Sequence, residues 1–118
     1  MKPPKFDYFA PTDIAAALAL IAEHGEDSRF LAGGQSLVPM MNFRVAAPSA
    51  LIDLNQIAEL QEIRVDDTGD LHLGAMTRTR QIECDPVIGA ANPVLQATAF
   101  HIAHVQIRNR GTIGGSLA

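Results

Sequence analysis

The chain has 118 residues, of which 47% are hydrophobic and 19% charged, with a formal net charge of -4 at pH 7. This composition is typical of one globular domain with a core, and it excludes disordered and fibrous proteins. The acidic balance, without a run of Lys or Arg, argues against binding to nucleic acid or an anionic membrane surface. A single cysteine, Cys84, allows no internal disulfide, and the N-terminus has no apolar signal region. We therefore expect a cytoplasmic protein without a membrane span.

The first third of the chain predicts alternating strands and helices. A strand over residues 6–9 precedes a helix that Thr12 can cap and that ends near Gly25. The apolar side chains of this helix recur at helical spacing and are Ile14, Ala17, Leu18 and Ile21. A second strand over residues 29–32 leads into a Gly-Gly pair and a short helix over residues 35–42. This order predicts βαβ packing, with the Gly-Gly pair at the carboxyl end of a strand, where open α/β sheets bind ligands.

The middle of the chain predicts a buried strand and a hairpin. Residues 50–54 favour the buried strand, and residues 55–60 favour a turn with a little helix. Polar and apolar residues alternate over residues 63–65 and 71–73, which indicates a hairpin with an acidic tip at residues 66–70. We interpret the tip as a solvated turn, because a calcium loop needs more ligands at fixed spacing.

The last third favours helices. A weak helix is expected to end near Cys84, and Asn92 with Pro93 can begin another. The apolar stripe of that second helix would be Leu95, Ala99 and Ile102. His101 and His104 would fall three residues apart on it, but further metal ligands at plausible spacing are not apparent.

Two Gly-Gly segments lie far apart in the sequence and have similar chemistry. Residues 31–37 read Leu-Ala-Gly-Gly-Gln-Ser-Leu, and residues 111–116 read Gly-Thr-Ile-Gly-Gly-Ser. Glycine can adopt left-handed dihedral angles and expose backbone N–H groups, which in succession form a nest for an anion such as phosphate. Arg108 and Arg110 precede the second segment and could support the same anion or only be solvated. Two structural turns without a ligand are the alternative.

No motif indicates catalysis by the chain itself. The sequence lacks a nucleophile elbow, a zinc pattern and the glycine fingerprints of nicotinamide and P-loop folds. Any chemistry would therefore be carried by a bound cofactor.

The chain resembles the flavoprotein (medium) subunit of molybdenum hydroxylases, the family of aerobic carbon monoxide dehydrogenase and xanthine dehydrogenase. Residues 31–42 are similar to the first FAD-pyrophosphate loop of that family. Residues 51–55, 73–77 and 106–115 are similar to the same family in the same order. The likeness spans nearly the whole chain.

The resemblance implies an α/β (α+β) fold, the N-terminal subdomain of an FAD-binding domain of the p-cresol-methylhydroxylase type. A small, mostly parallel sheet, flanking helices and a hairpin are expected, and residues 1–118 would be the N-terminal part of that domain, with the chain truncated at Ala118. The residues carried over as FAD-binding are Ala32, Gly33, Gly34, Gln35, Ser36, Thr112, Ile113, Gly114, Gly115 and Ser116. Backbone N–H groups and the Ser36 hydroxyl would wrap the pyrophosphate, and the second segment would close over it. Ser116 stands where the family often has Asn or Asp.

By the same resemblance, the intact protein is an FAD-containing oxidoreductase subunit. It would pass electrons to an acceptor from [2Fe-2S] clusters in a small subunit, which receive them from a molybdenum cofactor in a large subunit. A hetero-oligomer is therefore expected, with no catalytic residue or metal ligand in this chain, and the fragment alone would be inactive. The alternatives are a single-chain FAD-dependent oxidase of the same superfold, a non-redox phosphate or nucleotide binder, and a small interaction domain.

Overall fold

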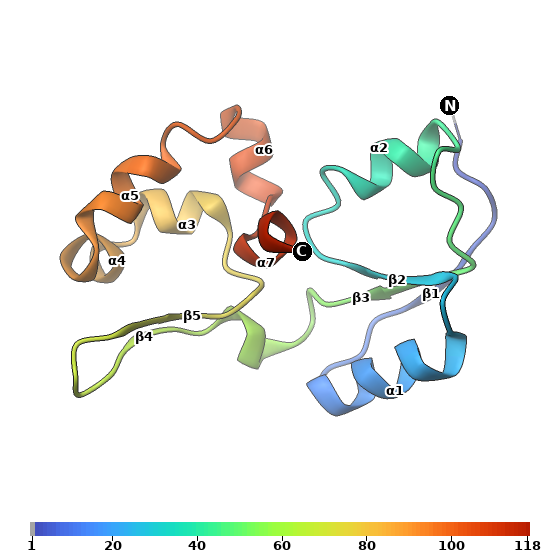
Figure 1. Ribbon diagram of the computed structural model, residues 1–118, viewed down its shortest axis with the longest axis horizontal. Helices are drawn as coiled ribbons and strands as arrows, with labels where there is room; N and C mark the ends of the chain where they lie inside the picture. The colour runs from blue at the N-terminus through green and yellow to red at the C-terminus, as the bar shows by residue number, and fades with distance from the viewer. Residues whose placement is uncertain (1) are drawn as a thin grey trace. The chain divides into compact units, whose positions relative to one another are not determined.

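The computed structural model describes residues 2–118, which form two compact units (Figure 1). The first unit ends at Ala58, and the second comprises Glu59–Ala118. The first contains a parallel sheet with helices, and the second contains a hairpin covered by helices. The expected α/β architecture is therefore confirmed.

The first unit is built on three parallel strands in the order β1-β3-β2. Its elements are β1 (Asp7–Phe9), α1 (Ile14–His24), β2 (Ser28–Leu31), α2 (Leu37–Asn42) and β3 (Ala50–Asp53). All four residues of β3 are buried, because it is the central strand and pairs with both neighbours. Helices α1 and α2 lie on opposite sides of this sheet (Figure 1). The predicted buried strand and βαβ order are confirmed.

Two details of α1 differ from expectation. Its N-cap is Asp13 rather than Thr12, and the carboxylate accepts a hydrogen bond from the Ala16 N–H at 2.7 Å. A carboxylate suits this position because it also interacts favourably with the positive end of the helix dipole. Ala17 is buried, whereas Leu18 is 57% exposed, so small alanine side chains bring the helix close to β2 and β3. The predicted end at Gly25 is confirmed, with φ of 73° at that residue.

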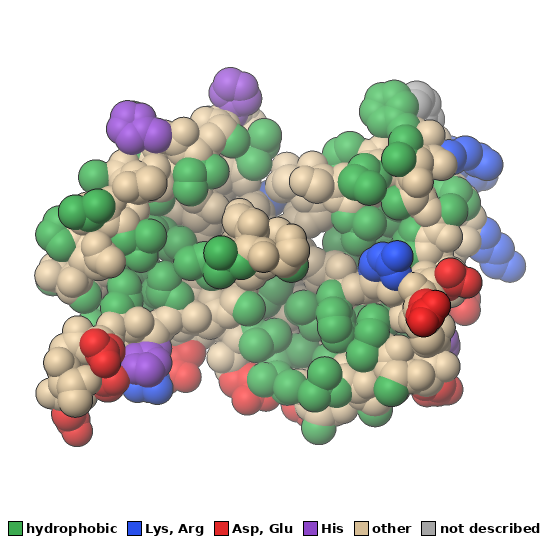
Figure 2. All heavy atoms as spheres, in the orientation of Figure 1, with side chains coloured by type: hydrophobic (Ala, Val, Ile, Leu, Met, Phe, Trp, Pro, Cys, Tyr) green, Lys and Arg blue, Asp and Glu red, His purple; other side chains and the backbone are tan. Residues whose placement is uncertain are grey.

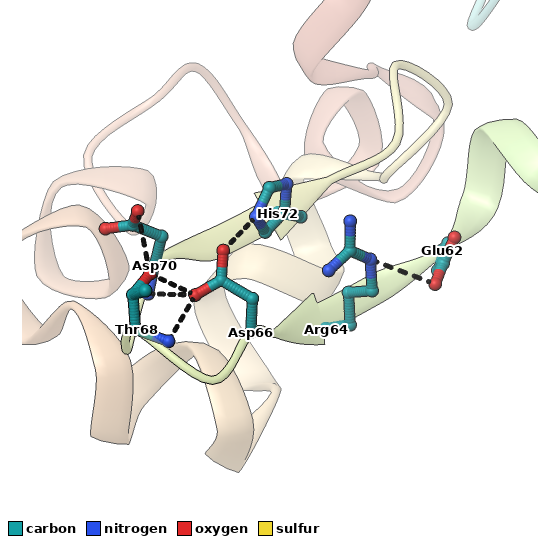
Figure 3. Close-up of polar contacts among 6 residues, drawn as sticks. All are labelled: Glu62, Arg64, Asp66, Thr68, Asp70 and His72. Atoms are coloured by element: carbon teal, nitrogen blue, oxygen red, sulfur yellow. Dashed lines mark hydrogen bonds and ion pairs between the residues drawn. The ribbon is translucent and has the colours of Figure 1, made fainter.

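The hairpin of the second unit is also as predicted. A 3₁₀ helix (η1, Ala58–Gln61) precedes β4 (Ile63–Val65), which pairs antiparallel with β5 (Leu71–Leu73). At the tip, the Asp66 carboxylate accepts hydrogen bonds from the Thr68 and Asp70 N–H groups (Figure 3). Acidic side chains gather at this end of the hairpin (Figure 2).

Five helices complete the second unit. They are α3 (Thr79–Cys84), α4 (Pro86–Ala91), α5 (Pro93–Ala99), α6 (Val105–Arg110) and α7 (Ile113–Leu117). Ile82, Ile88 and Ala99 from the first three of these helices form the core against the apolar side chains of the hairpin. Sequence reasoning missed α4, because a proline after a helix was interpreted as a stop. Here Pro86 occupies the first helical position behind an Asp85 N-cap, where the missing N–H costs nothing.

The helix predicted to carry both histidines is shorter than expected. It ends at Ala99, and Ala103 has a left-handed φ of 49°, which breaks the helical path. His104 is instead the N-cap residue of α6, a helix where a non-helical segment was expected. The placement of His101 and His104 on one helix was therefore wrong.

Candidate functional site

The first Gly-Gly segment lies at the carboxyl edge of the parallel sheet. Strand β2 ends at Leu31, whose carbonyl oxygen accepts a hydrogen bond from the Leu54 N–H at 2.9 Å just beyond β3. Because parallel strands end at the same edge, the segments after β2 and β3 lie side by side there. This is the edge where open α/β sheets place ligands.

The backbone of the first segment presents unused donors. Within residues 2–118, no N–H group from Ala32 to Ser36 donates a hydrogen bond. Gly34 has φ of 73°, a left-handed backbone conformation that residues other than glycine rarely adopt. The hydroxyl of Ser36 makes no hydrogen bond to cap α2. A run of free N–H groups around a left-handed glycine forms an anion nest.

A polar network joins this segment to both neighbouring strands. The Asn55 Nδ2 atom donates to the Ala32 carbonyl oxygen at 3.1 Å and to Asp53 Oδ1 at 2.6 Å. Asp53 Oδ1 also accepts from the Asn55 N–H at 2.9 Å, and Asp53 Oδ2 accepts from the Tyr8 hydroxyl. That hydrogen bond, together with burial and the carboxylate charge, raises the pKa of Tyr8. Sequence reasoning assigned no role to these three side chains. Tyr8 and Asp53 lie within predicted strands, and Asn55 directly follows one.

The second Gly-Gly segment is a helix rather than a turn. Thr112 is the N-cap of α7, and its Oγ1 accepts a hydrogen bond from the Gly115 N–H at 3.1 Å. Neither glycine of the pair has a positive φ. The expectation of two similar glycine turns was therefore wrong for this segment.

The backbone N–H groups from Ile113 to Ser116 already donate hydrogen bonds within the second unit. Ile113 donates to the Thr77 carbonyl at 3.0 Å, and Gly114 donates to the Ala75 carbonyl at 2.8 Å. Ser116 donates to the Thr112 carbonyl at 3.1 Å. From Ile113 to Ser116 the backbone donors are satisfied inside the second unit, so side chains such as the Ser116 hydroxyl are what this stretch offers to a ligand.

Arg108 is held inside the second unit. Its side chain is 10% exposed and its Nε atom lies 3.1 Å from Glu83 Oε2, while the guanidinium donates to the carbonyls of Ile102 and Ala103. The guanidinium also lies over the Phe100 ring, 5.5 Å from its centre. Arg108 therefore fixes α6 and the preceding loop. Its guanidinium is neither exposed to solvent nor available to bind an anion.

The described part of the chain contains neither a metal-binding cluster nor a membrane-spanning helix. His101 and His104 are exposed, and no group of three or more His, Cys, Asp or Glu side chains in residues 2–118 could hold a metal ion. No helix in the same residues is long and apolar enough to cross a membrane.

A parallel α/β unit with an anion nest at its carboxyl edge defines a class of phosphate- or nucleotide-binding protein. The model of the family described as the FAD binding domain in molybdopterin dehydrogenase matches residues 4–118. The chain belongs to that family.

Curated relatives agree with this assignment. The chain is 48% identical over 118 residues to the 6-hydroxypseudooxynicotine dehydrogenase complex subunit alpha of Paenarthrobacter nicotinovorans, covering 100% of this chain and 40% of the relative. It is 46% identical to the carbon monoxide dehydrogenase medium chain of Hydrogenophaga pseudoflava, covering 100% of this chain and 41% of the relative. The chain thus spans about two fifths of the length of these relatives.

Solved structures show the same fold. A chain of carbon monoxide dehydrogenase from Hydrogenophaga pseudoflava lacking the Mo-pyranopterin moiety superposes with a TM-score of 0.95 at 45% identity, over 99% of this chain and 40% of that one. Quinoline 2-oxidoreductase from Pseudomonas putida 86 gives a TM-score of 0.94 at 42% identity, over 100% of this chain and 41% of that one.

The residues present fit the cofactor of this family. FAD carries a pyrophosphate, and the first segment offers an anion free backbone N–H groups and an uncommitted Ser36 hydroxyl. A Cβ on Gly34 would lie 3.1 Å from Val38 Cγ2, so a side chain there would crowd the loop. The nearest carboxylate in the network, Asp53, already accepts from Asn55 and Tyr8.

Proposed function

We propose that Ala32–Ser36 binds the pyrophosphate of FAD through backbone N–H groups and the Ser36 hydroxyl. The observation that carries this proposal is the run of unused N–H groups around the left-handed Gly34. In the second unit, Thr112–Ser116 is a further proposed FAD-binding segment, with Ser116 contributing its side chain. When bound, FAD supplies the redox chemistry, and the chain's residues hold and orient the cofactor.

We further propose that the whole protein is the FAD-binding electron-transfer subunit of a molybdenum-iron-sulfur-flavin dehydrogenase. It would pass electrons from [2Fe-2S] clusters of a small subunit, supplied by a molybdenum-containing large subunit, to an acceptor. Support comes from the relatives, which are named as a subunit of a dehydrogenase complex and as a medium chain. The single exposed cysteine is consistent with a reducing compartment such as the cytoplasm.

The test of FAD binding is a fluorescence titration of the full-length gene product with FAD, with FMN and ADP alongside. FMN lacks the pyrophosphate bridge and ADP lacks the flavin, so tighter binding of FAD than of either shows that both parts are recognised. Equal binding of ADP and FAD would favour a non-redox nucleotide binder. A folded protein that does not bind FAD would contradict the proposal.

A matched pair of glycine variants locates the site. Gly25 and Gly34 both have φ of 73° in the first unit, so aspartate strains the backbone at each position. Gly34→Asp also places a carboxylate beside the proposed pyrophosphate, and we expect it to abolish FAD binding. Gly25→Asp should leave the affinity within about twofold of wild type, because this residue only ends α1. Equal losses in the two variants would place the pyrophosphate elsewhere.

A further inference from the structure

The carbonyl groups of the first segment are held by hydrogen bonds on the side away from its free N–H groups. The Ala32 carbonyl accepts from Asn55 Nδ2, and the Gly33 carbonyl accepts from Gln35 Nε2 at 3.1 Å. The Gly34 carbonyl accepts from the Val38 N–H at 3.1 Å. The loop is thus held through its acceptors while its donors remain available.

Holding a carbonyl also orients the next N–H group. The peptide unit is planar and trans, so its C=O and N–H point in opposite directions. The Ala32 carbonyl shares a peptide unit with the Gly33 N–H, and a bond to Asn55 on one side therefore turns that N–H to the other side. Asn55 is the donor for the first peptide unit beyond the sheet ladder, where no strand neighbour holds the backbone.

Asn55 is itself fixed by a carboxylate. Asp53 Oδ1 accepts from both the backbone N–H and the Nδ2 atom of Asn55, which fixes the amide with its N–H groups toward Asp53 and Ala32. The Tyr8 hydroxyl donates to the second oxygen of the same carboxylate. Tyr8 of β1 and Asp53 of β3 thereby support the loop that follows β2.

We propose that Asn55, fixed by Asp53 and Tyr8, is a positioning residue that turns the Gly33 N–H toward the FAD pyrophosphate. This inference rests on the proposed FAD site. Asn55 does not touch the cofactor in this assignment. It acts by setting the direction of the Ala32–Gly33 peptide before the ligand arrives, so that binding does not have to order it.

The test compares FAD dissociation constants of full-length variants between pH 5 and pH 8. Asn55→Ala removes the donor and should weaken FAD binding roughly tenfold at every pH, which is the effect of one hydrogen bond. The control is Gln56→Ala in the same unit, because the exposed Gln56 side chain makes no hydrogen bond within residues 2–118, and its affinity should equal that of wild type. Thermal unfolding of each variant checks that it is folded.

Asn55→Asp separates positioning from a merely structural role. At pH 8 the new carboxylate cannot donate to the Ala32 carbonyl and repels Asp53, so affinity should fall more than in Asn55→Ala. The neighbouring Asp53 charge raises the pKa of the introduced carboxyl, so lowering the pH protonates it and restores a donor. FAD affinity of this variant should therefore recover towards pH 5, while wild type and Asn55→Ala show no such recovery. Tyr8→Phe, which keeps the ring, should give a smaller loss in the same direction.

Different results would overturn the FAD site and the positioning role of Asn55. Wild-type protein that is folded but does not bind FAD would overturn both. Wild-type protein that binds FAD, with Asn55→Ala and Asn55→Asp binding equally tightly at pH 8, would overturn the positioning role alone. A loss in Asn55→Asp without recovery at low pH would show that the side chain acts only through folding.

Discussion

A Cβ atom on Gly114 would lie 2.7 Å from the carbonyl oxygen of Ala75, so helix α7 rests directly on the backbone at residue 75. The Gly114 N–H donates to the same oxygen at 2.8 Å. The glycine is therefore needed for packing within the second unit. A loss of cofactor in a Gly114 variant would consequently not identify a ligand contact.

Gly114→Ala should lower the free energy of unfolding. Alanine gains about 1 kcal/mol over glycine in helix propensity. Displacing α7 from Ala75 costs about 1–3 kcal/mol through overpacking, and the strained hydrogen bond costs about 1 kcal/mol more. The packing and hydrogen-bond costs exceed the gain in helix propensity. We therefore expect the free energy of unfolding, measured by urea unfolding followed by circular dichroism, to fall by about 1–3 kcal/mol. Ser116→Ala, on the exposed end of the same helix, is the control and should change stability by less than about 0.5 kcal/mol.

Thr77→Val should stabilise the protein. Thr77 is completely buried, and its Oγ1 has no hydrogen-bond partner in the described part of the chain. Valine has nearly the same shape and lacks the buried hydroxyl. We therefore expect the free energy of unfolding to rise by about 1 kcal/mol. Thr112→Val is the matched comparison, because the buried Thr112 Oγ1 caps α7, and it should lose about 1 kcal/mol. A loss of stability in Thr77→Val would mean that its hydroxyl is bonded in solution.

The Glu83 carboxylate should make stability depend on pH. The hydrogen bond from Arg80 lowers the pKa of Glu83, and the charges of Arg108 and Arg80 add to this. Because the native pKa lies below the unfolded value, the stabilisation is fully present above about pH 5 and is lost as the pH falls through the native pKa. Glu83→Gln should therefore lower the melting temperature at pH 7 and do so less at pH 3.

Glu62→Gln is the control for that comparison. Glu62 also pairs with an arginine, Arg64, at 3.3 Å, but both side chains are about half exposed (Figure 3). An exposed pair contributes little, so the melting temperature should hardly change. Equal effects of the two substitutions would contradict the importance of the Glu83–Arg108 pair.

The hairpin tip should titrate at unusually low pH. The Thr68 hydroxyl, His72 and the backbone N–H groups of Asp70 and Thr68 hold the pKa of Asp66 well below its usual range. The tip is therefore stabilised above about pH 4 and loses this contribution as the pH falls towards the native pKa. Carbon-13 NMR of the carboxyl group should show a lowered midpoint, which Thr68→Val raises more than His72→Gln. An Asp66 midpoint near 4 in wild type would contradict this.

Local patterns in the sequence were sufficient for much of the fold. Alternation predicted the hairpin, and the strand–helix–strand order predicted the parallel sheet with the Gly34 segment at its edge. Helix α7 was not predictable, because its glycines have low helix propensity and its first N–H groups are bonded to Ala75 and Thr77, far away in the sequence. The part played by Asn55 was hidden for the same reason. Its contact with Ala32 exists only once β2 and β3 are paired.

The strand order also sets when the first unit can form during synthesis. Strands β1 and β2 do not pair with each other, and each pairs only with β3, the last of the three in the chain. During synthesis, β1 and β2 therefore lack a pairing strand until β3, which ends at Asp53, has emerged from the ribosome. Folding of this unit is therefore a single late event, in which the sheet, the loop at Gly34 and the side chain that fixes it come together when the third strand arrives.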